Sequence, residues 1–285
     1  MKKCVFLFLL SFTLLSSSIW GLNEQEDSTA ASPCSFEISF WKPLIFGGYT
    51  EVREWQYIGQ KYNLNEDLGL NSLESFEFTF SFPLSRNHHI NVLLGRYFFQ
   101  GHQLLTENGY YNGTELTENT VASVDASRYI RILLLDYFTL SETEKEKLQL
   151  VFGISLDAIR FLVDAPYTPT TPRKETFEQF DKQIVPVPMI GIKWNKHLSD
   201  NTLLRAEGRA GTWPGLDTWY DEEGTIKIWQ YNLETYIGVS KYFGNVVSEL
   251  NFNFRMIYLK GESNEDTNEI FIHGFGPELR IVYEF

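Results

Sequence analysis

Apolar and polar residues alternate at every second position over long stretches of this chain. Phenylalanine occupies every second position between residues 76 and 82, and Ser, Glu and Thr lie between. The same alternation marks residues 148–156, 229–239 and 246–258. A period of two predicts β-strands with one apolar and one mostly polar face.

Weaker alternation predicts further strands at 35–48, 89–99, 120–138, 183–194 and 201–213. We therefore expect an all-β fold of about ten strands, with eight or twelve as the alternatives. Pro186 and Pro188 fall inside one of these segments. Because proline cannot donate a backbone hydrogen bond to the ladder, we expect a β-bulge at that place.

Short and long connections alternate between the predicted strands. The short ones lie near 85–87, 140–146, 196–200 and 243–245. The long ones, near 51–71, 101–118, 165–182, 215–225 and 260–268, are rich in Gly, Asn, Pro and charge. This order predicts a single antiparallel up-and-down β-barrel with short turns at one end and five long loops at the other.

The last strand carries the most specific pattern in the sequence. One face is formed by Leu279, Ile281, Tyr283 and the terminal Phe285, and the other by Glu278, Arg280, Val282 and Glu284. An amphipathic strand that ends on an aromatic residue resembles the terminal strand of Gram-negative outer-membrane β-barrels. The resemblance implies a transmembrane barrel in outer-membrane lipid. It also implies that the barrel-assembly machinery recognises the apolar face of this strand, Leu279, Ile281, Tyr283 and Phe285. Pro277 is a small departure from the pattern.

The other end of the chain predicts export. Lys2 and Lys3 precede an apolar run over residues 5–15, followed by three serines. This pattern is typical of a secretory signal peptide, and the run is too short to span a bilayer. We expect a signal peptide over 1–21 with Sec-type export, a polar periplasmic tail over 22–34, and the outer-membrane barrel over 35–285.

Composition agrees with a membrane barrel and excludes other classes. Aromatic residues make up 16% of the chain, which suits the aromatic girdles of such barrels. The net charge of −13 argues against a nucleic-acid partner. Beyond the signal peptide only Cys34 remains, so no internal disulfide is expected.

A secreted lipocalin-like barrel is the alternative, since it would show the same period with its apolar face inside. The polar faces favour the membrane barrel. They mix charges of both signs, such as Glu77 and Asp157, with Ser, Asn, Gln and Gly. Such a mixture suits a crowded interior in which charges must pair.

The candidate site is the set of charges on these polar faces. Arg205, Glu207 and Arg209 share one face of a strand, and neighbouring strands add Glu234, Glu249, Arg255, Glu278 and Arg280. Such charges could form a constriction that selects solutes. They could equally form an ion-pair network that fills a narrow lumen. We expect ion pairing across the interior rather than an open, water-filled pore.

No catalytic, metal or cofactor site is predicted. His197-Leu198-Ser199 matches the His-x-Ser spacing of lipid A deacylases, but it falls in a predicted turn. The Asp-x-His pair of omptin proteases does not occur, and nothing local identifies the triad of outer-membrane phospholipases. We therefore expect the chain not to be an enzyme and to hold no cofactor.

The long loops offer acidic residues to an external ligand. The two groups are Asp221, Glu222 and Glu223, and Glu262, Glu265, Asp266 and Glu269. We expect a small structural or narrow solute-passing barrel with acidic external loops. The alternatives are a surface protein that binds a partner through these loops and a lipid-modifying enzyme. The sequence leaves the oligomeric state open.

Overall fold

The computed structural model describes residues 34–53, 59–85, 88–111, 114–124, 128–161, 163, 185–221, 224–263 and 267–285. The predicted signal peptide and the tail up to residue 33 lie outside this range. The strands are β1 (Ser35–Trp41), β2 (Ile45–Arg53), β3 (Lys61–Asn63), β4 (Leu70–Ser85), β5 (His88–Leu104), β6 (Gly109–Tyr111), β7 (Thr114–Leu116), β8 (Val121–Ser123), β9 (Arg128–Glu142), β10 (Glu146–Arg160), β11 (Pro186–Ser199), β12 (Thr202–Asp221), β13 (Gly224–Phe243), β14 (Val246–Glu262) and β15 (Thr267–Glu284). None of the described residues forms a helix long and apolar enough to cross a membrane.

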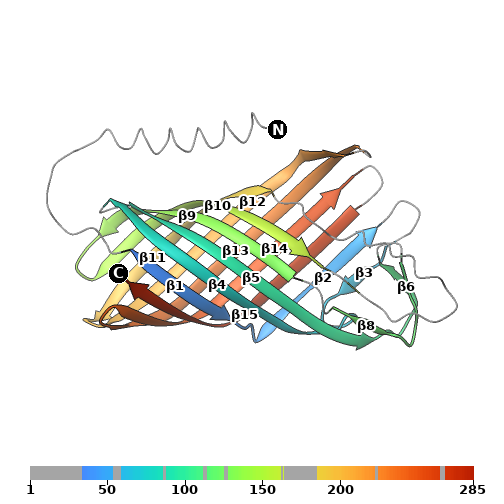
Figure 1. The fold of residues 1–285 in the computed structure, drawn as a ribbon, viewed down its shortest axis with the longest axis horizontal. Helices are drawn as coiled ribbons and strands as arrows, with labels where there is room; N and C mark the ends of the chain where they lie inside the picture. The colour runs from blue at the N-terminus through green and yellow to red at the C-terminus, as the bar shows by residue number, and fades with distance from the viewer. Residues whose placement is uncertain are drawn as a thin grey trace. The chain divides into compact units, whose positions relative to one another are not determined.

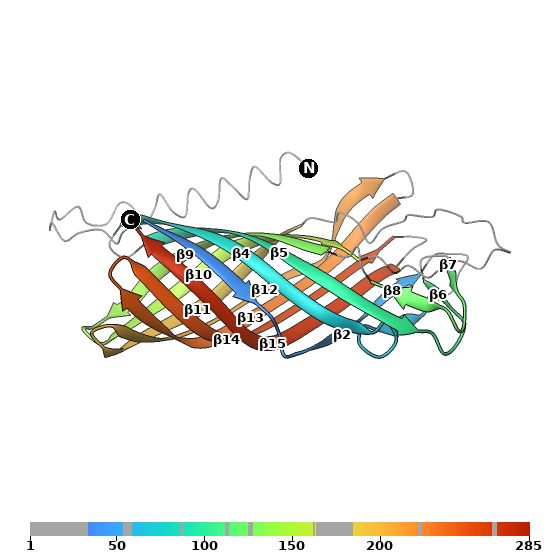
Figure 2. The same cartoon turned by 60° about the horizontal axis from the view of Figure 1, so that its bottom comes forward.

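Ten antiparallel strands close into a barrel, as the sequence predicts (Figure 1). The strand order follows the chain, and β1 closes the ring by pairing with both β4 and β15 (Figure 2). β1 and β2 act as one strand that is interrupted at residues 42–44, because both pair with successive parts of β15. Pro43 lies in the interruption, where its missing N–H removes no ladder bond.

The short connections are confirmed and gather at one end of the barrel, which we call the turn end. β9 and β10 are separated by residues 143–145, and β13 and β14 by Gly244 and Asn245 alone. Gly244 has φ +63°, a backbone conformation that glycine adopts without strain. Both described chain ends, Cys34 and Phe285, also lie there, and Phe285 N donates to Cys34 O at 2.9 Å.

The opposite end, which we call the loop end, differs from the prediction in two ways. β12, β13, β14 and β15 extend well beyond the expected limits, so most of 215–225 and 260–268 is strand rather than loop. The predicted strand 120–138 is two elements. β8 folds back onto β5, and β9 enters the barrel wall. Short-range alternation could not reveal that these two pieces pair with different parts of β5.

The bulge predicted at the prolines of β11 is also wrong. The β10–β11 ladder runs without a register shift from Lys196 to Pro186. The ladder between β11 and β12 begins only at Met189, so Pro186 and Pro188 have a ladder partner on one side alone. An edge position tolerates proline without distortion of the strand.

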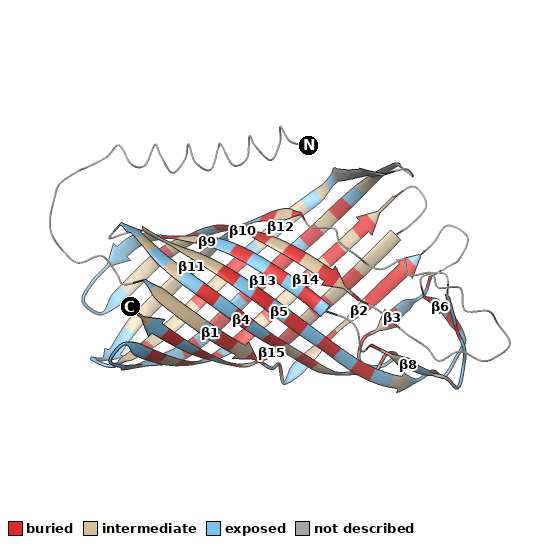
Figure 3. Ribbon diagram, in the orientation of Figure 1, coloured by how far each residue is buried: buried red, intermediate tan, exposed pale blue. Residues whose placement is uncertain are grey.

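Burial alternates along most strands of the wall (Figure 3). On β14, Phe252 is 47% exposed while Asn251 and Asn253 are fully buried. Apolar side chains thus face outward and polar ones face the lumen in the half next to the turn end. A soluble lipocalin-like barrel has the reverse arrangement.

The lumen holds two apolar clusters besides its polar residues. The larger cluster lies toward the loop end and combines wall residues such as Phe99 and Ile257 with Leu64, Leu68 and Tyr111 from the connections. The smaller cluster packs around Leu133 and Val151. The loop-end half of the barrel is therefore filled by a core of the kind found in soluble domains.

Candidate functional site

Glu234 of β13 is the centre of an ion-pair network that crosses the lumen. Its Oε2 accepts from Arg209 Nη2 at 2.6 Å and from Arg131 Nη1 at 3.0 Å, and its Oε1 lies 3.0 Å from Arg255 Nε. Arg131 belongs to β9, and three strands separate β9 from β13 in the wall. Arg209 and Arg255 are the partners of Glu234 on the adjacent strands β12 and β14. A single carboxylate therefore joins two neighbouring arginines to one that reaches it across the lumen.

Arg255 carries the network toward β4 and β15. Its Nη1 donates to Glu77 Oε1 at 2.5 Å, and its Nη2 donates to Glu278. Glu278 also accepts from Arg280, whose Nη2 lies 2.7 Å from Glu278 Oε2. Charge-assisted bonds of this kind are stronger than neutral ones and fix the geometry of the groups they join.

A third group lies nearer the turn end. Glu207 accepts from Arg209 Nη1 at 2.7 Å and from the phenol of Tyr236 at 2.9 Å. Arg205 pairs with Glu249, also near the turn end. Glu207, Arg209 and Glu249 are almost completely buried and Arg205 is partly buried, so the loss of one arginine would leave a buried carboxylate unpaired.

Asp157 on β10 is fully buried and surrounded by donors. Ser155 Oγ, Gln230 Nε2 and Asn232 Nδ2 donate to its Oδ2 at 2.7, 2.6 and 2.8 Å, and Tyr129 donates to its Oδ1. A buried carboxylate needs such partners to remain charged. Arg131 Nε donates to Ser155 Oγ at 3.4 Å, which links the Asp157 group to the Glu234 hub.

The structure brings six of the eight predicted lumen charges into the network around Glu234, namely Glu207, Arg209, Glu234, Arg255, Glu278 and Arg280. Arg205 and Glu249 pair with each other. The sequence interpretation missed Arg131 and Lys193 and did not assign Glu77 and Asp157 to the site. Arg131 stands between Ile130 and Ile132 in an apolar strand. A single arginine on the inner face of such a strand is the signal that could have identified it.

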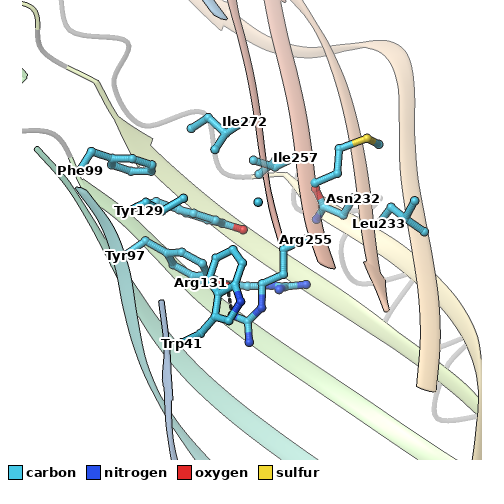
Figure 4. Close-up of a pocket in the computed structure, with 13 residues that line it drawn as sticks. Trp41, Tyr97, Phe99, Tyr129, Arg131, Asn232, Leu233, Arg255, Ile257 and Ile272 are labelled. Atoms are coloured by element: carbon cyan, nitrogen blue, oxygen red, sulfur yellow. Dashed lines mark hydrogen bonds between the residues drawn. The ribbon is translucent and has the colours of Figure 1, made fainter. Parts of the chain in front are cut away.

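A cavity of about 30 Å³ lies where the network meets the larger apolar cluster (Figure 4). Trp41, Tyr97 and Tyr129 line it with their rings, and Arg255 lies over the Trp41 ring at 4.8 Å from its centroid. The cavity has room for one or two water molecules.

The outer face carries the features of a lipid-facing surface. Near the loop end, Tyr49 packs on Phe271 and Tyr231 on Tyr258, with ring centroids 5.6 and 5.7 Å apart. In membrane barrels, aromatic residues on the outer face near either end of the apolar band form the interfacial girdles. At the turn end the four predicted assembly-signal residues, Leu279, Ile281, Tyr283 and Phe285, all point outward and are exposed.

The remaining candidates are scattered. His197-Leu198-Ser199 is exposed at the end of β11. On the outer face, His88 Nε2 lies 2.8 Å from Asp136 Oδ1. No group of three potential metal ligands occurs among the described residues. Of the acidic loops, residues 222–223 and 264–266 lie outside the described range.

Comparisons with known proteins identify the fold. No family model matches the chain, and no curated protein sequence matches it. The outer membrane protease OmpT from Escherichia coli has a TM-score of 0.52 at 12% identity, over 92% of this chain and 100% of that one. The translocator domain of the autotransporter NalP from Neisseria meningitidis has a TM-score of 0.41 at 10% identity, over 100% and 98%. The outer membrane protein AlkL has a TM-score of 0.34 at 14% identity, over 92% and 96%.

The expectation that the chain is not an enzyme is contradicted by the first of these comparisons. OmpT is a protease on a barrel of this architecture, so the lack of a recognisable motif did not justify excluding catalysis. At this identity the likeness shows the fold alone and assigns no catalytic residue. The chain has the fold of an outer-membrane β-barrel, and the comparisons support an outer-membrane location.

Proposed function

We propose that this protein is an integral outer-membrane barrel with a closed lumen, which acts as a structural element and presents a folded cap at its loop end. The observation that carries the proposal is the Glu234 hub, because Arg131 of β9 reaches it across the lumen while Arg209 and Arg255 pair with it from the two flanking strands. An ion-pair network across a ten-stranded barrel leaves no continuous path for water or solutes.

The folded cap at the loop end is the connection between β5 and β9, and its structure supports the proposal that the protein presents a defined surface there. The connection between β5 and β9 contains β6, β7 and β8, and it buries Leu105, Tyr111 and Leu116 against the larger apolar cluster. A connection with its own buried side chains has a defined shape. The proposal includes export by the signal peptide over 1–21 and recognition of the terminal strand by the assembly machinery.

Conductance in a planar lipid bilayer tests the closed lumen. We expect the full mature chain to insert without discrete conductance steps. A porin-like step conductance in the unmodified protein would contradict the proposal. Insertion is verified separately by the heat-modifiable migration of the same sample in electrophoresis.

Arg209→Ala gives a second test of the same network. The substitution removes partners from Glu234 and Glu207, so the free energy of unfolding should fall by roughly 3–5 kcal/mol while conductance stays unchanged. Arg128→Ala is the matched control, because Arg128 is exposed on the outer face of β9 and should change stability by about 0.5 kcal/mol or less. Unchanged stability with altered ion selectivity for Arg209→Ala would indicate a water-filled channel.

A further inference from the structure

The barrel wall lacks a backbone ladder in one place. β1 pairs with β4 up to Trp41 and Ser75. Beyond the interruption at 42–44, β2 remains paired with β15, but among the described residues its other side pairs only with the three residues of β3. A seam without strand-to-strand hydrogen bonds therefore runs between β2 and the loop-end part of β4, residues 70–74.

Residues 64–69, between β3 and β4, fill the seam as a compact turn rather than as a strand. Leu64 and Leu68 are fully buried in the larger apolar cluster. Leu64 N donates to Gly48 O at 3.0 Å, and Leu70 N donates to Leu64 O at 2.7 Å. On one side β3 joins this turn to β2 through a three-residue ladder. On the side of β4 no ladder is formed, and the contacts there include Leu70 N to Leu64 O and Asn65 Nδ2 to Leu70 O. The seam can therefore open between the turn and β4 without breaking a ladder.

One ion pair lies on the outer face of the barrel, at the end of the seam that is nearer the turn end. Lys42 Nζ lies 2.6 Å from Glu74 Oε1, directly beyond the last backbone pair between β1 and β4. Leu44, Ile45 and Phe76 beside it are exposed apolar side chains. The seam therefore opens toward the apolar, lipid-facing surface, where charged side chains are costly and need a partner.

The cavity at Trp41 lies directly behind this ion pair. Two of the residues that line the cavity, Trp41 of β1 and Leu73 of β4, lie beside the end of the seam that is nearer the turn end. Trp41 is 1% exposed, and its Nε1–H has no hydrogen-bond acceptor among the described residues. Phe99, Ile257 and Ile272 form the apolar part of the lining. The site thus offers one unused donor next to apolar walls.

We propose that this cavity receives the head of a neutral, single-chain amphiphile that enters from the membrane through the seam. The head must accept a hydrogen bond, as a hydroxyl, ketone or ester oxygen does, because Trp41 Nε1–H can only donate. Charged heads fit poorly. Arg131 and Arg255 at the cavity already pair with Glu234, Glu77 and Glu278, and an additional buried charge would have no partner.

Nuclear magnetic resonance of the Trp41 indole tests the proposal. The full mature chain in nanodiscs of saturated phosphatidylcholine is titrated with decan-1-ol, and the Trp41 resonance is assigned by its loss in Trp41→Phe. We expect a saturable downfield shift of the indole proton, while the Trp229 resonance on the outer face stays in place. Decanoate and decyltrimethylammonium should cause no saturable shift. With n-decane, which has no acceptor atom, the indole proton should show no downfield shift.

Binding measurements on variants add a second readout. Trp41→Phe should weaken decan-1-ol binding about fivefold, as expected for one neutral hydrogen bond, and leave n-decane binding unchanged. Trp229→Phe is the matched control. Glu74→Gln should speed decan-1-ol association without changing the shift at saturation, because it opens the seam and leaves the cavity intact.

Three outcomes would overturn the proposal. One is a Trp41 resonance that does not move with decan-1-ol and shows contact with water only. Another is equal binding of the neutral and the charged decyl compounds. The third is decan-1-ol binding that Trp41→Phe leaves unchanged. None of these outcomes bears on the conductance test of the closed lumen.

Discussion

The ammonium group of Lys42 lies 2.6 Å from the carboxylate of Glu74 at the point where the hydrogen bonds between β1 and β4 end. A side-chain contact thus takes over from the backbone ladder. Both side chains are partly exposed, and an exposed ion pair contributes about 0–1 kcal/mol. The wall is therefore held less firmly on this side than anywhere that two long strands pair.

Hydrogen exchange should reveal this difference within a single strand. Amides of residues 70–74 in β4 should exchange faster than those of residues 75–81, because only the latter have β1 as a second neighbour. The measurement is amide exchange followed by mass spectrometry in lipid nanodiscs. Equal protection along the whole of β4 would show that the seam is closed by bonds absent from this structure.

Phe252 on the outer face of β14 is a position at which the cost of a charge in the lipid-facing band can be measured. Phe252→Arg should lower the free energy of unfolding by roughly 2–4 kcal/mol at mid-bilayer depth. Phe252→Leu is the matched control and should have a much smaller effect. Urea unfolding in lipid vesicles measures both. A loss for Phe252→Arg no greater than that for the control would place this residue outside the hydrocarbon region.

Deletion of Phe285 tests the terminal strand as an assembly signal. The Phe285 ring packs edge-on against Tyr283 with centroids 5.1 Å apart and is largely exposed. We expect the shortened chain to remain in the periplasm and be degraded, whereas Phe285→Tyr should assemble. Membrane fractionation with heat-modifiable migration is the assay, and normal outer-membrane levels of the shortened chain would refute the signal.

Tyr62 of β3, which precedes the turn in the seam, should titrate at an unusually high pH. Burial, followed by the charges of Asp67 and Glu107, raises the pKa of Tyr62 to about 12, above its ordinary value near ~10. The raised pKa means that the neutral phenol stabilises the folded state fully below pH ~10. This stabilisation is lost as the pH rises from ~10 through the folded pKa.

Absorbance at 295 nm measures this titration as the difference between the unmodified chain and Tyr62→Phe. The difference should show one phenol with a midpoint near pH 12. Across the same interval the unmodified chain should lose stability relative to Tyr62→Phe. A midpoint near the ordinary value would mean that Tyr62 is solvated in solution.

Strand positions and facing could be predicted because they depend on neighbours in sequence. Phe252 and Asn251 differ by one position, and the period of two alone places them on opposite faces. The interruption of the first strand could have been predicted as well, since Lys42-Pro43 is visible in the sequence. The predicted strand 35–48 has Pro43 near its middle, where a proline removes a ladder donor and indicates an interruption.

The pairing of charges could not be predicted in this way. Arg131 and Glu234 meet across the lumen, and their contact depends on the number of strands, the register of every ladder and the closure of the ring. The same holds for the cavity, where Trp41 and Ile257 come together from distant parts of the chain. Such contacts follow from the three-dimensional arrangement rather than from local pattern.

The pairing of β1 with β15 has a kinetic consequence. Ser35 and Glu284 are partners in this ladder, although they stand at opposite ends of the described chain. Contacts between residues so far apart in sequence form slowly. Until they form, β1 and β15 each present an open edge that can pair with another chain. The polypeptide therefore passes through an aggregation-prone period before the ring closes, in which both edges are open to pairing with another chain.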